Sequence, residues 1–558
     1  MSDFTTINVV GAGLSGLSAA ITLARKGYSC NLISALPSER AQSVLAEGGI
    51  NAALNTMGEN DTTMEHFKDT MKGGLYLESY DAVRGLTENA PSVVADLVRL
   101  GVPFRSENGQ IILRNFGGQK KKRTAYAKSS TGKMIMTALI DEARKYEVDG
   151  LIKRYPHHVF TKVGISDGIL HSITVTDTFN NKNIIFKGKT IICTGGLNGI
   201  FPGLTTGTTQ NTGNAAAILF DAGVELANLE FIQYHPTTVS ISDKRMLISE
   251  AARGEGGRLY IMRDGKPWYF MEEKYPELKN LMPRDVISRE MTLVRENPSC
   301  TGDVYLDMTG IEAFVWKEKL SDLRKEIIEY LFLDPAVEPV PVSPGIHFFM
   351  GGIRVNDRHE TNVKGLYAAG EAACKYHGAN RLGGNSMLGA LYGGRVAAEA
   401  ATAALDGKRD EETETADEVK KNTEEIDKAA YYEKNPKETN YDLTDYTSTP
   451  LYDERLKNIL REGLGIVRDK ESMVKAYDSI ASMIEESGMS DIDISRARLG
   501  LAMVGLAIER KESRGAHYRI DYPDAKDEYK KTSVAKFEDG KIKLYFADID
   551  DGDWVYDI

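Results

Sequence analysis

Three glycines near the N-terminus have the spacing of a loop that binds a dinucleotide. Gly11, Gly13 and Gly16 follow a short apolar segment and open a segment with helical spacing. In such a loop the first glycine makes a tight turn, the second lets the backbone approach a pyrophosphate, and the third allows close packing of helix on strand. The helix N-terminus adds amide donors. We therefore favour dinucleotide binding, with Ala12 in the same loop, over a tight turn without a ligand.

The residue that ends the second predicted strand narrows the choice of dinucleotide. That strand usually ends in Asp or Glu, which binds a ribose hydroxyl, but here it ends in Ser34. The missing carboxylate weakens an assignment to NAD. It leaves FAD, with the hydroxyl of Ser34 as a substitute.

Histidines, arginines and a glutamate recur in five later segments, where they could bind carboxylates or move protons. The segments are residues 231–237, 248–257, 283–285, 345–352 and 377–386. Arginine suits a carboxylate because its planar fork can donate two parallel hydrogen bonds. Arg381 lies among glycines, where a backbone can approach a ligand closely. Glu250 precedes Arg253 by three residues, so on a helix the two would share a face and either relay a proton or form an ordinary ion pair.

The elements that must position these groups predict a doubly wound α/β fold. Residues 7–10 and 30–33 are expected to be strands, with a helix over residues 14–26 between them. Apolar stretches that run into glycines, at residues 191–196 and 365–371, predict further strands. A sheet assembled from such distant strand–turn units is typical of a Rossmann-like domain.

A length of 558 residues exceeds what one core usually supports, so several domains are expected. We divide the chain into a Rossmann-like FAD-binding domain with an inserted α+β capping domain and a C-terminal helical domain. The predicted ranges are 1–235 and 344–405 for the two parts of the FAD-binding domain, 236–343 for the capping domain, and 406–558 for a charged linker and the helical domain.

Three segments outside the motifs carry expectations of their own. Residues 408–440 are dominated by Glu, Lys, Asp and Thr and predict a solvated helix or linker. A strand is expected at residues 542–546, after the helices of the last domain. The run of residues 119–123, Gln-Lys-Lys-Lys-Arg, predicts a solvated loop rather than a patch that draws an anion to the site.

Residues 40–50, Arg-Ala-Gln-Ser-Val-Leu-Ala-Glu-Gly-Gly-Ile, resemble a loop of the flavoprotein subunits of fumarate reductase and succinate dehydrogenase. In that family the loop reads Arg-Ser-His-Thr-x-x-Ala-Gln-Gly-Gly, and its histidine is bonded covalently to FAD. Gln42 stands at the histidine position and has no nucleophilic ring nitrogen. The resemblance therefore implies FAD that is bound non-covalently. It spans about residues 6–405 and resumes at residues 510–523.

The same resemblance implies a set of cofactor-binding residues. Asn214 occupies a position where the family has Asp. Together with the glycine loop and Ser34, the implied FAD contacts are Arg40, Ser43, Gly48, Gly49, Asn214, Glu371, Asn385, Ser386 and Met387.

Roles in the chemistry also follow from the resemblance. It implies that a C4 dicarboxylate, fumarate or succinate, is bound by four residues: His235, Ser249, His347 and Arg381. Ser249 replaces a family threonine, and both side chains offer a hydroxyl. Arg284 would deliver the proton while hydride moves between flavin N5 and the substrate, and Glu250 and Arg253 would relay that proton from solvent. An ordinary helix cap by Arg284 and Asp285 is the alternative.

The composition of the chain limits the partners and cofactors that it can be expected to bind. A net charge of −12 argues against nucleic acid. Cys30, Cys193, Cys300 and Cys374 lie far apart in sequence, so no metal site or cluster is expected. Electrons would then come from an iron-sulfur subunit or a small-molecule donor. We see no run of transmembrane length and no secretory leader, which predicts a cytoplasmic protein without direct membrane insertion, or one that partner subunits hold at the inner face of a membrane.

Several other functions remain open at this level. L-aspartate oxidases share the fold and most carboxylate-binding residues, but Arg381-Leu-Gly-Gly-Asn-Ser and Met350-Gly-Gly are the fumarate reductase forms of two motifs. A related FAD-dependent enoate reductase is a second alternative, although the retained His235 disfavours it. A catalytically silent FAD scaffold and an RNA-modifying flavoprotein are disfavoured by the acidic charge and by the intact set of His235, Arg284 and Arg381.

Overall fold

The computed structural model describes residues 6–127, 130–241, 244–414 and 450–549. Its centre is a sheet of five parallel strands in the order β21-β12-β1-β2-β8. These strands are β1 (Ile7–Val10), β2 (Cys30–Ser34), β8 (Ile152–Pro156), β12 (Thr190–Ile192) and β21 (Leu366–Ala368). The order, which runs outward in both directions from β1, confirms the predicted doubly wound fold.

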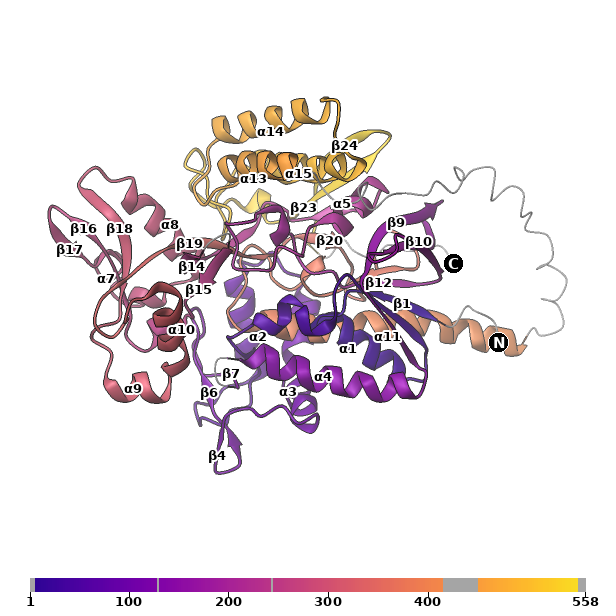
Figure 1. The fold of residues 1–558 in the computed structure, drawn as a ribbon, viewed down its shortest axis with the longest axis horizontal. Helices are drawn as coiled ribbons and strands as arrows, with labels where there is room; N and C mark the ends of the chain where they lie inside the picture. The colour runs from indigo at the N-terminus through magenta and orange to yellow at the C-terminus, as the bar shows by residue number, and fades with distance from the viewer. Residues whose placement is uncertain (1–5, 128–129, 242–243, 415–449, 550–558) are drawn as a thin grey trace.

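Helices pack beside the central sheet and against one another, and together with the sheet they form a hydrophobic core. They are α1 (Leu14–Arg25), α2 (Thr63–Gly73), α3 (Tyr80–Arg99), α4 (Thr131–Val148) and α11 (Asn385–Glu414). Figure 1 shows α1, α4 and α11 lying close together beside β1 and β12. Almost all of α1 is buried, as its apolar spacing predicts, and the left-handed φ of 79° at Gly27 turns the chain away after its end.

Three smaller sheets extend this domain. One is antiparallel and consists of β9 (His158–Ser166), β10 (Ile169–Asp177) and β11 (Asn183–Lys187). Another consists of β3 (Ile50–Asn51), β6 (Leu113–Arg114) and β7 (Thr124–Ala125), and β4 (Ser106–Glu107) pairs with β5 (Gln110–Ile111). The helix α5 (Asn214–Asp221) packs on β9.

A capping domain is built on a sheet of six strands in the order β15-β14-β19-β18-β16-β17. The strands are β14 (Ile232–Ile241), β15 (Lys244–Leu247), β16 (Arg258–Arg263), β17 (Lys266–Trp268), β18 (Cys300–Asp307) and β19 (Val340–Phe349). Its helices are α6 (Ala251–Gly254), α7 (Phe270–Lys274), α8 (Arg284–Arg295), α9 (Ala313–Glu318) and α10 (Ser321–Leu331). A hydrophobic core of its own runs from Val239 to Val342. The domain limits at 235/236 and 343/344 stay a prediction, since β14 and β19 continue across them.

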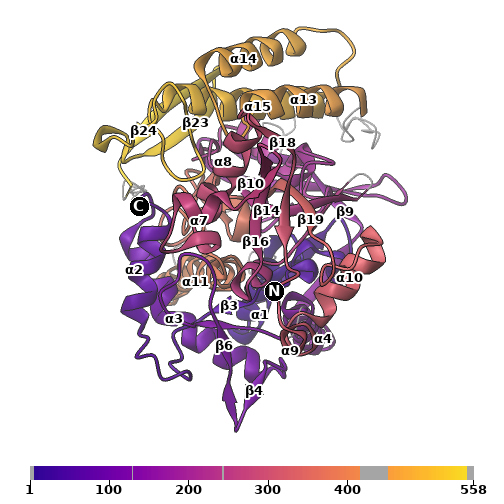
Figure 2. The same cartoon turned by 90° about the vertical axis from the view of Figure 1, so that its left-hand side faces the viewer.

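The C-terminal part combines helices with two strands. It contains α13 (Pro450–Gly463), α14 (Lys470–Ile484) and α15 (Asp491–Glu509), which Figures 1 and 2 show as a layer on top of the molecule. The predicted strand at residues 542–546 is β24 (Lys541–Ala547), which pairs with β23 (Thr532–Glu538). β23 joins β13 (Leu226–Ala227), β20 (Gly352–Arg354) and β22 (Ala373–Cys374) in one sheet. Backbone hydrogen bonds between β23 and β13 therefore connect the C-terminal part to the FAD-binding domain.

Two expectations about charged segments have mixed outcomes. The loop of residues 119–123 is not solvated throughout, because Gln119 and Arg123 are buried and Arg123 forms ion pairs with Asp61 and Asp69. Of the charged residues 408–440, those up to Glu414 belong to α11, and the rest lie outside the described residues.

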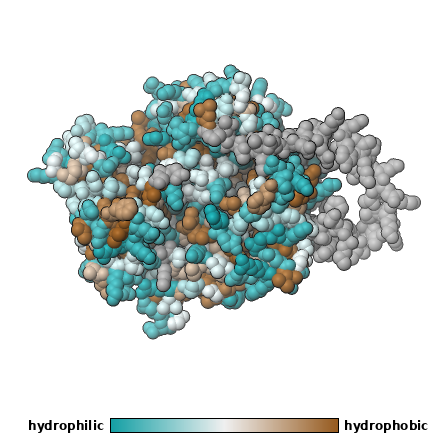
Figure 3. Space-filling view, viewed as in Figure 1, coloured by the Kyte–Doolittle hydropathy of each residue, from teal (hydrophilic) through white to brown (hydrophobic). Residues whose placement is uncertain are grey.

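The face in Figure 3 is largely hydrophilic, with hydrophobic side chains scattered over it. No helix in the described part of the chain is both long and apolar enough to cross a membrane.

Candidate active site

One cavity of about 790 Å³ connects the glycine loop to the capping domain. Most predicted cofactor residues line it: Gly11, Ala12, Gly13, Ser34, Arg40, Ser43, Gly48, Gly49, Asn214, Glu371, Ser386 and Met387. So do six of the seven predicted substrate or proton-transfer residues, namely His235, Ser249, Glu250, Arg284, His347 and Arg381. A ligand that begins at the glycine loop can therefore reach the histidine and arginine side chains without leaving the cavity.

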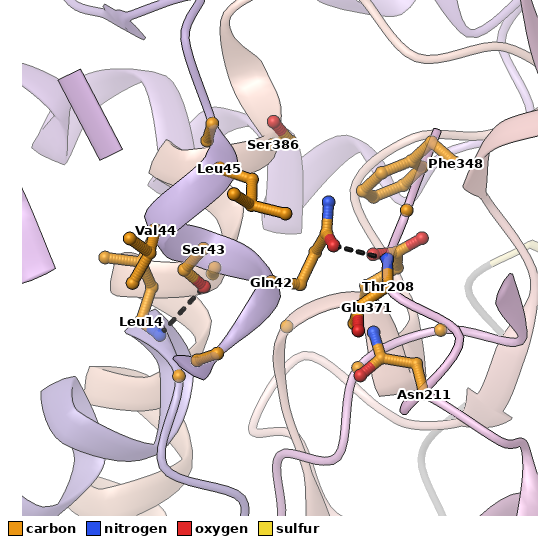
Figure 4. Close-up of a pocket in the computed structure, with 18 of the residues that line it drawn as sticks. Leu14, Gln42, Ser43, Val44, Leu45, Thr208, Asn211, Phe348, Glu371 and Ser386 are labelled. Atoms are coloured by element: carbon orange, nitrogen blue, oxygen red, sulfur yellow. Dashed lines mark hydrogen bonds between the residues drawn. The ribbon is translucent and has the colours of Figure 1, made fainter. Parts of the chain in front are cut away.

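The glycine loop has the close contacts that a dinucleotide site needs. A Cβ at Gly11 would lie 2.1 Å from the carbonyl oxygen of Cys193, and a Cβ at Gly16 would lie 1.7 Å from that of Gly11. Gly16 does not line the cavity, so its role is the close packing of α1 on β1. No side chain caps the N-terminus of α1 at Gly13, although Ser43 Oγ accepts the N–H of Leu14 at 3.2 Å (Figure 4). This loop and helix end fit the pyrophosphate of FAD.

Gln42 extends across the middle of the cavity. Its Oε1 accepts the backbone N–H of Thr208 at 2.5 Å, and Figure 4 shows the side chain pointing from the loop of Ser43 toward Thr208 and Glu371. An amide at this position can donate and accept hydrogen bonds but cannot form the bond that a histidine ring makes with flavin. The structure thus places the substituted residue inside the cavity that FAD would fill.

Of two other predicted cofactor residues, Glu371 faces the cavity and Asn385 does not. Glu371 lines the cavity and accepts the N–H of Phe349 at 3.1 Å, and burial raises the pKa of its carboxyl to about 7. Asn385 does not line the cavity. Its buried amide instead joins Asn51, His66 and Thr70 through hydrogen bonds of 2.7, 3.0 and 3.0 Å. The structure therefore gives Asn385 contacts that hold the neighbouring loop of Gly383 and Gly384 in place, while Asn385 itself does not face the cavity.

Two histidines meet at the capping-domain end of the cavity. The rings of His235 on β14 and His347 on β19 have centroids 5.4 Å apart, because these strands pair antiparallel. Thr206 Oγ1 is hydrogen-bonded to Nδ1 of His347 at 2.8 Å, which fixes that ring. Burial, followed by the charge of Arg284, lowers the pKa of both imidazoles well below the ordinary value. Both rings are thus neutral near pH 7 and can donate hydrogen bonds to an anion without adding charge.

Arg284 lies beside these histidines and is held by a carboxylate. As the first residue of α8, it donates to Glu250 Oε2 from Nε at 3.3 Å and from Nη2 at 2.9 Å. The other oxygen of Glu250 accepts from Arg253 Nη2 at 3.1 Å, which confirms the predicted pairing of these residues across one helical turn. Burial alone would raise the pKa of Glu250, but the two arginines outweigh it and lower that pKa to about 2.

Arg253 does not open onto solvent in this structure. Its side chain has 0% exposure, it does not line the cavity, and its Nε and Nη1 have no hydrogen-bond partner in the part of the chain that is described. Hydrogen bonds therefore connect Arg284, Glu250 and Arg253 without a gap. Arg253 still needs a further group or a water molecule to exchange protons with solvent. Ser249 lines the cavity one residue before Glu250, as its predicted role requires.

Sequence models of two known protein regions match this chain. The FAD binding domain matches residues 7–387, and the fumarate reductase flavoprotein C-terminal region matches residues 495–555. The chain is 36% identical to the succinate dehydrogenase flavoprotein subunit of Bacillus subtilis (strain 168), over 95% of this chain and 94% of that protein. The chain belongs to the fumarate reductase and succinate dehydrogenase flavoprotein family. It is an FAD-dependent oxidoreductase, as the resemblance of its motifs implies.

Two further comparisons cover nearly the whole chain. A fumarate reductase flavoprotein subunit of Mycobacterium tuberculosis is 32% identical over 97% of each protein. A chain of E. coli quinol fumarate reductase superposes with a TM-score of 0.82 at 26% identity and covers 98% of this chain and 97% of that one. The likeness therefore includes the capping domain and the C-terminal part of this flavoprotein, as well as its FAD-binding domain.

Gln233 is the residue of this flavoprotein's site that the sequence reasoning missed. Its Oε1 accepts from Arg381 Nη2 at 2.9 Å and from Arg284 Nη1 at 3.3 Å, so one amide oxygen joins the two arginines. Its Nε2 donates to Asn380 Oδ1 at 2.7 Å, and Asn380 Nδ2 donates to Asp285 at 2.9 Å. Gln233 lies two residues before His235 on β14, in the segment of residues 231–237 from which only the histidine is predicted to bind substrate.

Proposed function

We propose that this flavoprotein transfers hydride between FAD and a C4 dicarboxylate, in the manner of fumarate reductase and succinate dehydrogenase. The observation that carries the proposal is the convergence of Arg284 and Arg381 on Gln233, beside His235 and His347, at one end of a cavity that starts at the glycine loop. Two cations and two neutral donors suit a ligand with two carboxylates. FAD, when bound, would supply or accept the hydride.

Each side chain then has a distinct task. Arg381 binds one carboxylate, and His235, His347 and Ser249 donate hydrogen bonds to the substrate. Arg284 holds a proton next to the reacting carbon and releases it as hydride adds to the neighbouring carbon. Glu250 accepts from both Arg284 and Arg253, so it can pass a proton from Arg253 to Arg284 after Arg284 has given up its own proton and positive charge. The capping domain that carries Arg284 would exclude water from this end of the cavity.

A turnover assay tests the proposal directly. Purified holoprotein is expected to oxidise a reduced dye with fumarate, and to reduce an oxidised dye with succinate, while L-aspartate gives no flavin reduction. Flavin reduction by L-aspartate, without turnover of fumarate, would support an L-aspartate oxidase instead. Turnover of a different enoate in place of fumarate would support the related enoate reductases.

FAD is expected to be released intact when the protein is denatured. Gln42 replaces the histidine to which the family bonds FAD, and an amide is not a nucleophile of that kind. After acid precipitation the yellow colour should remain in the supernatant. Flavin fluorescence that stays with the denatured chain on a gel would contradict non-covalent binding.

Electrons must reach the flavin from outside this chain. The described residues include no group of histidine, cysteine, aspartate or glutamate side chains that could hold a metal. The four cysteines are free, and two of them, Cys30 and Cys193, are buried. We propose an iron-sulfur subunit or a small reduced molecule as the donor, and association with a membrane only through such partner subunits.

Replacing Gln233 by leucine is expected to lower kcat/KM for fumarate by about 10- to 100-fold, since a hydrogen bond to a charged group contributes about 1.5–3 kcal/mol. Leucine has a similar size but cannot accept hydrogen bonds from Arg284 and Arg381. Steady-state kinetics at equal FAD content would check this. Wild-type kinetics in Gln233→Leu would show that the two arginines are positioned by other contacts.

A further inference from the structure

Positive charge gathers along one wall of the cavity, outside the substrate-binding residues. Lys244 and Arg245 begin β15 and both line the cavity, although Lys244 is exposed. An exposed side chain that lines a cavity marks the place where it meets solvent. Arg461, in the last turn of α13, does not line the cavity, but it is exposed, and this end of α13 is held near β14 because Tyr234 donates its hydroxyl to the carbonyl of Leu464 at 3.1 Å.

Arg245 is held in place by neutral groups. Its guanidinium donates to the hydroxyls of Thr238 and Ser240 at 2.6 and 3.2 Å and to the carbonyl of Ser343 at 3.2 Å. Within the described residues, no carboxylate lies within ion-pair distance of Lys244, Arg245 or Arg461. Among the residues that the structure describes, the positive charge of this group is therefore not cancelled by an ion pair.

The position of Arg245 connects the cavity entrance with the histidines. A Cβ at Gly345 would lie 2.7 Å from Arg245 Cδ and Nε, so the glycine makes room for the arginine side chain. Gly345 is the register partner of His235 and precedes His347 by two residues. Burial lowers the pKa of Arg245, and the nearby charges of Arg295 and Arg461 lower it further, as expected where cations are gathered.

Carboxyl groups that line the cavity do not balance this charge fully. Glu47 and Glu326 are both in its wall. Burial, with a contribution from Glu326, raises the pKa of Glu47 to about 8, and burial raises that of Glu326 as well. Near neutral pH Glu47 therefore carries less negative charge than an exposed carboxylate does. Among the described residues, the side of the entrance that β15 forms is thus positive, on a protein whose net charge is −12.

We propose that Lys244, Arg245 and Arg461 form an anion entry site, which captures dicarboxylates at the cavity entrance and delivers them to His235, His347 and Arg381. This inference rests on the proposed function, since it assumes a dianionic substrate. Charges of one sign around a low-dielectric cavity concentrate ions of the opposite sign and raise their rate of association. The site would act on substrate capture and not on hydride or proton transfer.

The double variant Lys244→Gln, Arg461→Gln tests this, with Arg84→Gln as a control for the loss of surface charge elsewhere. Arg84 is an exposed arginine on α3 that does not line the cavity, so the control removes surface charge without touching the entrance. At about 20 mM ionic strength, kcat/KM of the double variant for fumarate should fall about three- to tenfold, with kcat unchanged within about twofold. The difference should disappear near 0.5 M salt, where the screening length is only about 4 Å. Arg245 is left intact because its hydrogen bonds join β14, β15 and β19.

Binding of malonate, measured by its effect on flavin absorbance, distinguishes failure of the proposed function from failure of the entry site. If wild-type protein turns over no fumarate but binds malonate, the proposed function fails while the entry site can still be tested through malonate association rates. Unchanged kcat/KM and unchanged malonate association in the double variant, or an equal loss in Arg84→Gln, would overturn the entry site. A loss in kcat with no salt dependence would overturn it too, and wild-type protein that neither turns over fumarate nor binds malonate would overturn both proposals.

Discussion

Replacing Arg284 by alanine is expected to lower kcat for fumarate reduction by at least about three orders of magnitude, provided that no water takes over as acid. Arg284 is the only arginine of the cavity that contacts both Glu250 and Gln233 within the described residues, so it joins the proton chain to the substrate-binding residues. Its proton is needed in the transition state, whereas Arg381, His235 and His347 remain to bind the ground state. A change confined to that step lowers turnover and leaves substrate binding nearly intact.

Two measurements separate this role from binding. Malonate should perturb the flavin spectrum of Arg284→Ala with nearly wild-type affinity, while fumarate turnover is lost. Arg289→Ala is a matched control, because Arg289 is on the same helix but packs over the ring of Tyr518, 4.8 Å from its centroid, and does not line the cavity. Near-normal turnover of Arg284→Ala with a raised KM would make Arg284 a binding group only.

Two further variants of the proton chain should rank below Arg284→Ala in effect. Arg284→Lys is expected to retain a trace of activity, since an ammonium group can donate a proton but has a different reach. Glu250→Gln should slow turnover less, because water can bypass a relay more readily than the terminal donor. The low pKa of Glu250, about 2, means that its charge is present throughout the working pH range, so the loss in Glu250→Gln should depend little on pH.

Local patterns predicted the parts of the fold that depend on neighbours in sequence. The strand, glycine loop and helix at residues 7–26 form as expected. Their signals all lie within one short segment: an apolar strand, a glycine turn, helical apolar spacing and Gly27 after the helix. The pairing of Glu250 with Arg253 follows in the same way from helical spacing. The join between β23 and β13 could not be predicted, because it links residues about 300 positions apart and leaves no local pattern.

The same limit applies to the candidate site. Gln233 carries no charge and has no distinctive spacing, and its importance depends on two arginines that come from α8 and from the loop before α11. The polar run of residues 119–123 predicts a solvated loop, yet Asp61 and Asp69 compensate the charge of Arg123 and allow its complete burial. Burial of a charge depends on its partners, and sequence-local composition does not reveal them.

Replacing Arg381 by alanine is expected to weaken dicarboxylate binding by about 2–5 kcal/mol, roughly 30- to 4000-fold in the dissociation constant. The guanidinium is buried over the ring of Phe348, 4.6 Å from its centroid, and Gln233 is its main acceptor. Its Nε has no hydrogen-bond partner in the described part of the chain. Burial, with the nearby charge of Arg284, lowers the pKa of Arg381 to about 9, which shows how poorly its charge is compensated without an anion.

A bound carboxylate would supply that missing compensation, so the energy lost in Arg381→Ala should be binding energy rather than stability. The variant should fold and retain FAD, because the glycine loop, Ser43 and Glu371 lie elsewhere along the cavity. Malonate titration followed by flavin absorbance measures the affinity, and the ratio of flavin to protein absorbance measures FAD content. Arg381→Lys should recover only part of the affinity, since a single ammonium group cannot make two parallel hydrogen bonds. Loss of FAD or of folding in both variants would instead make Arg381 a structural residue.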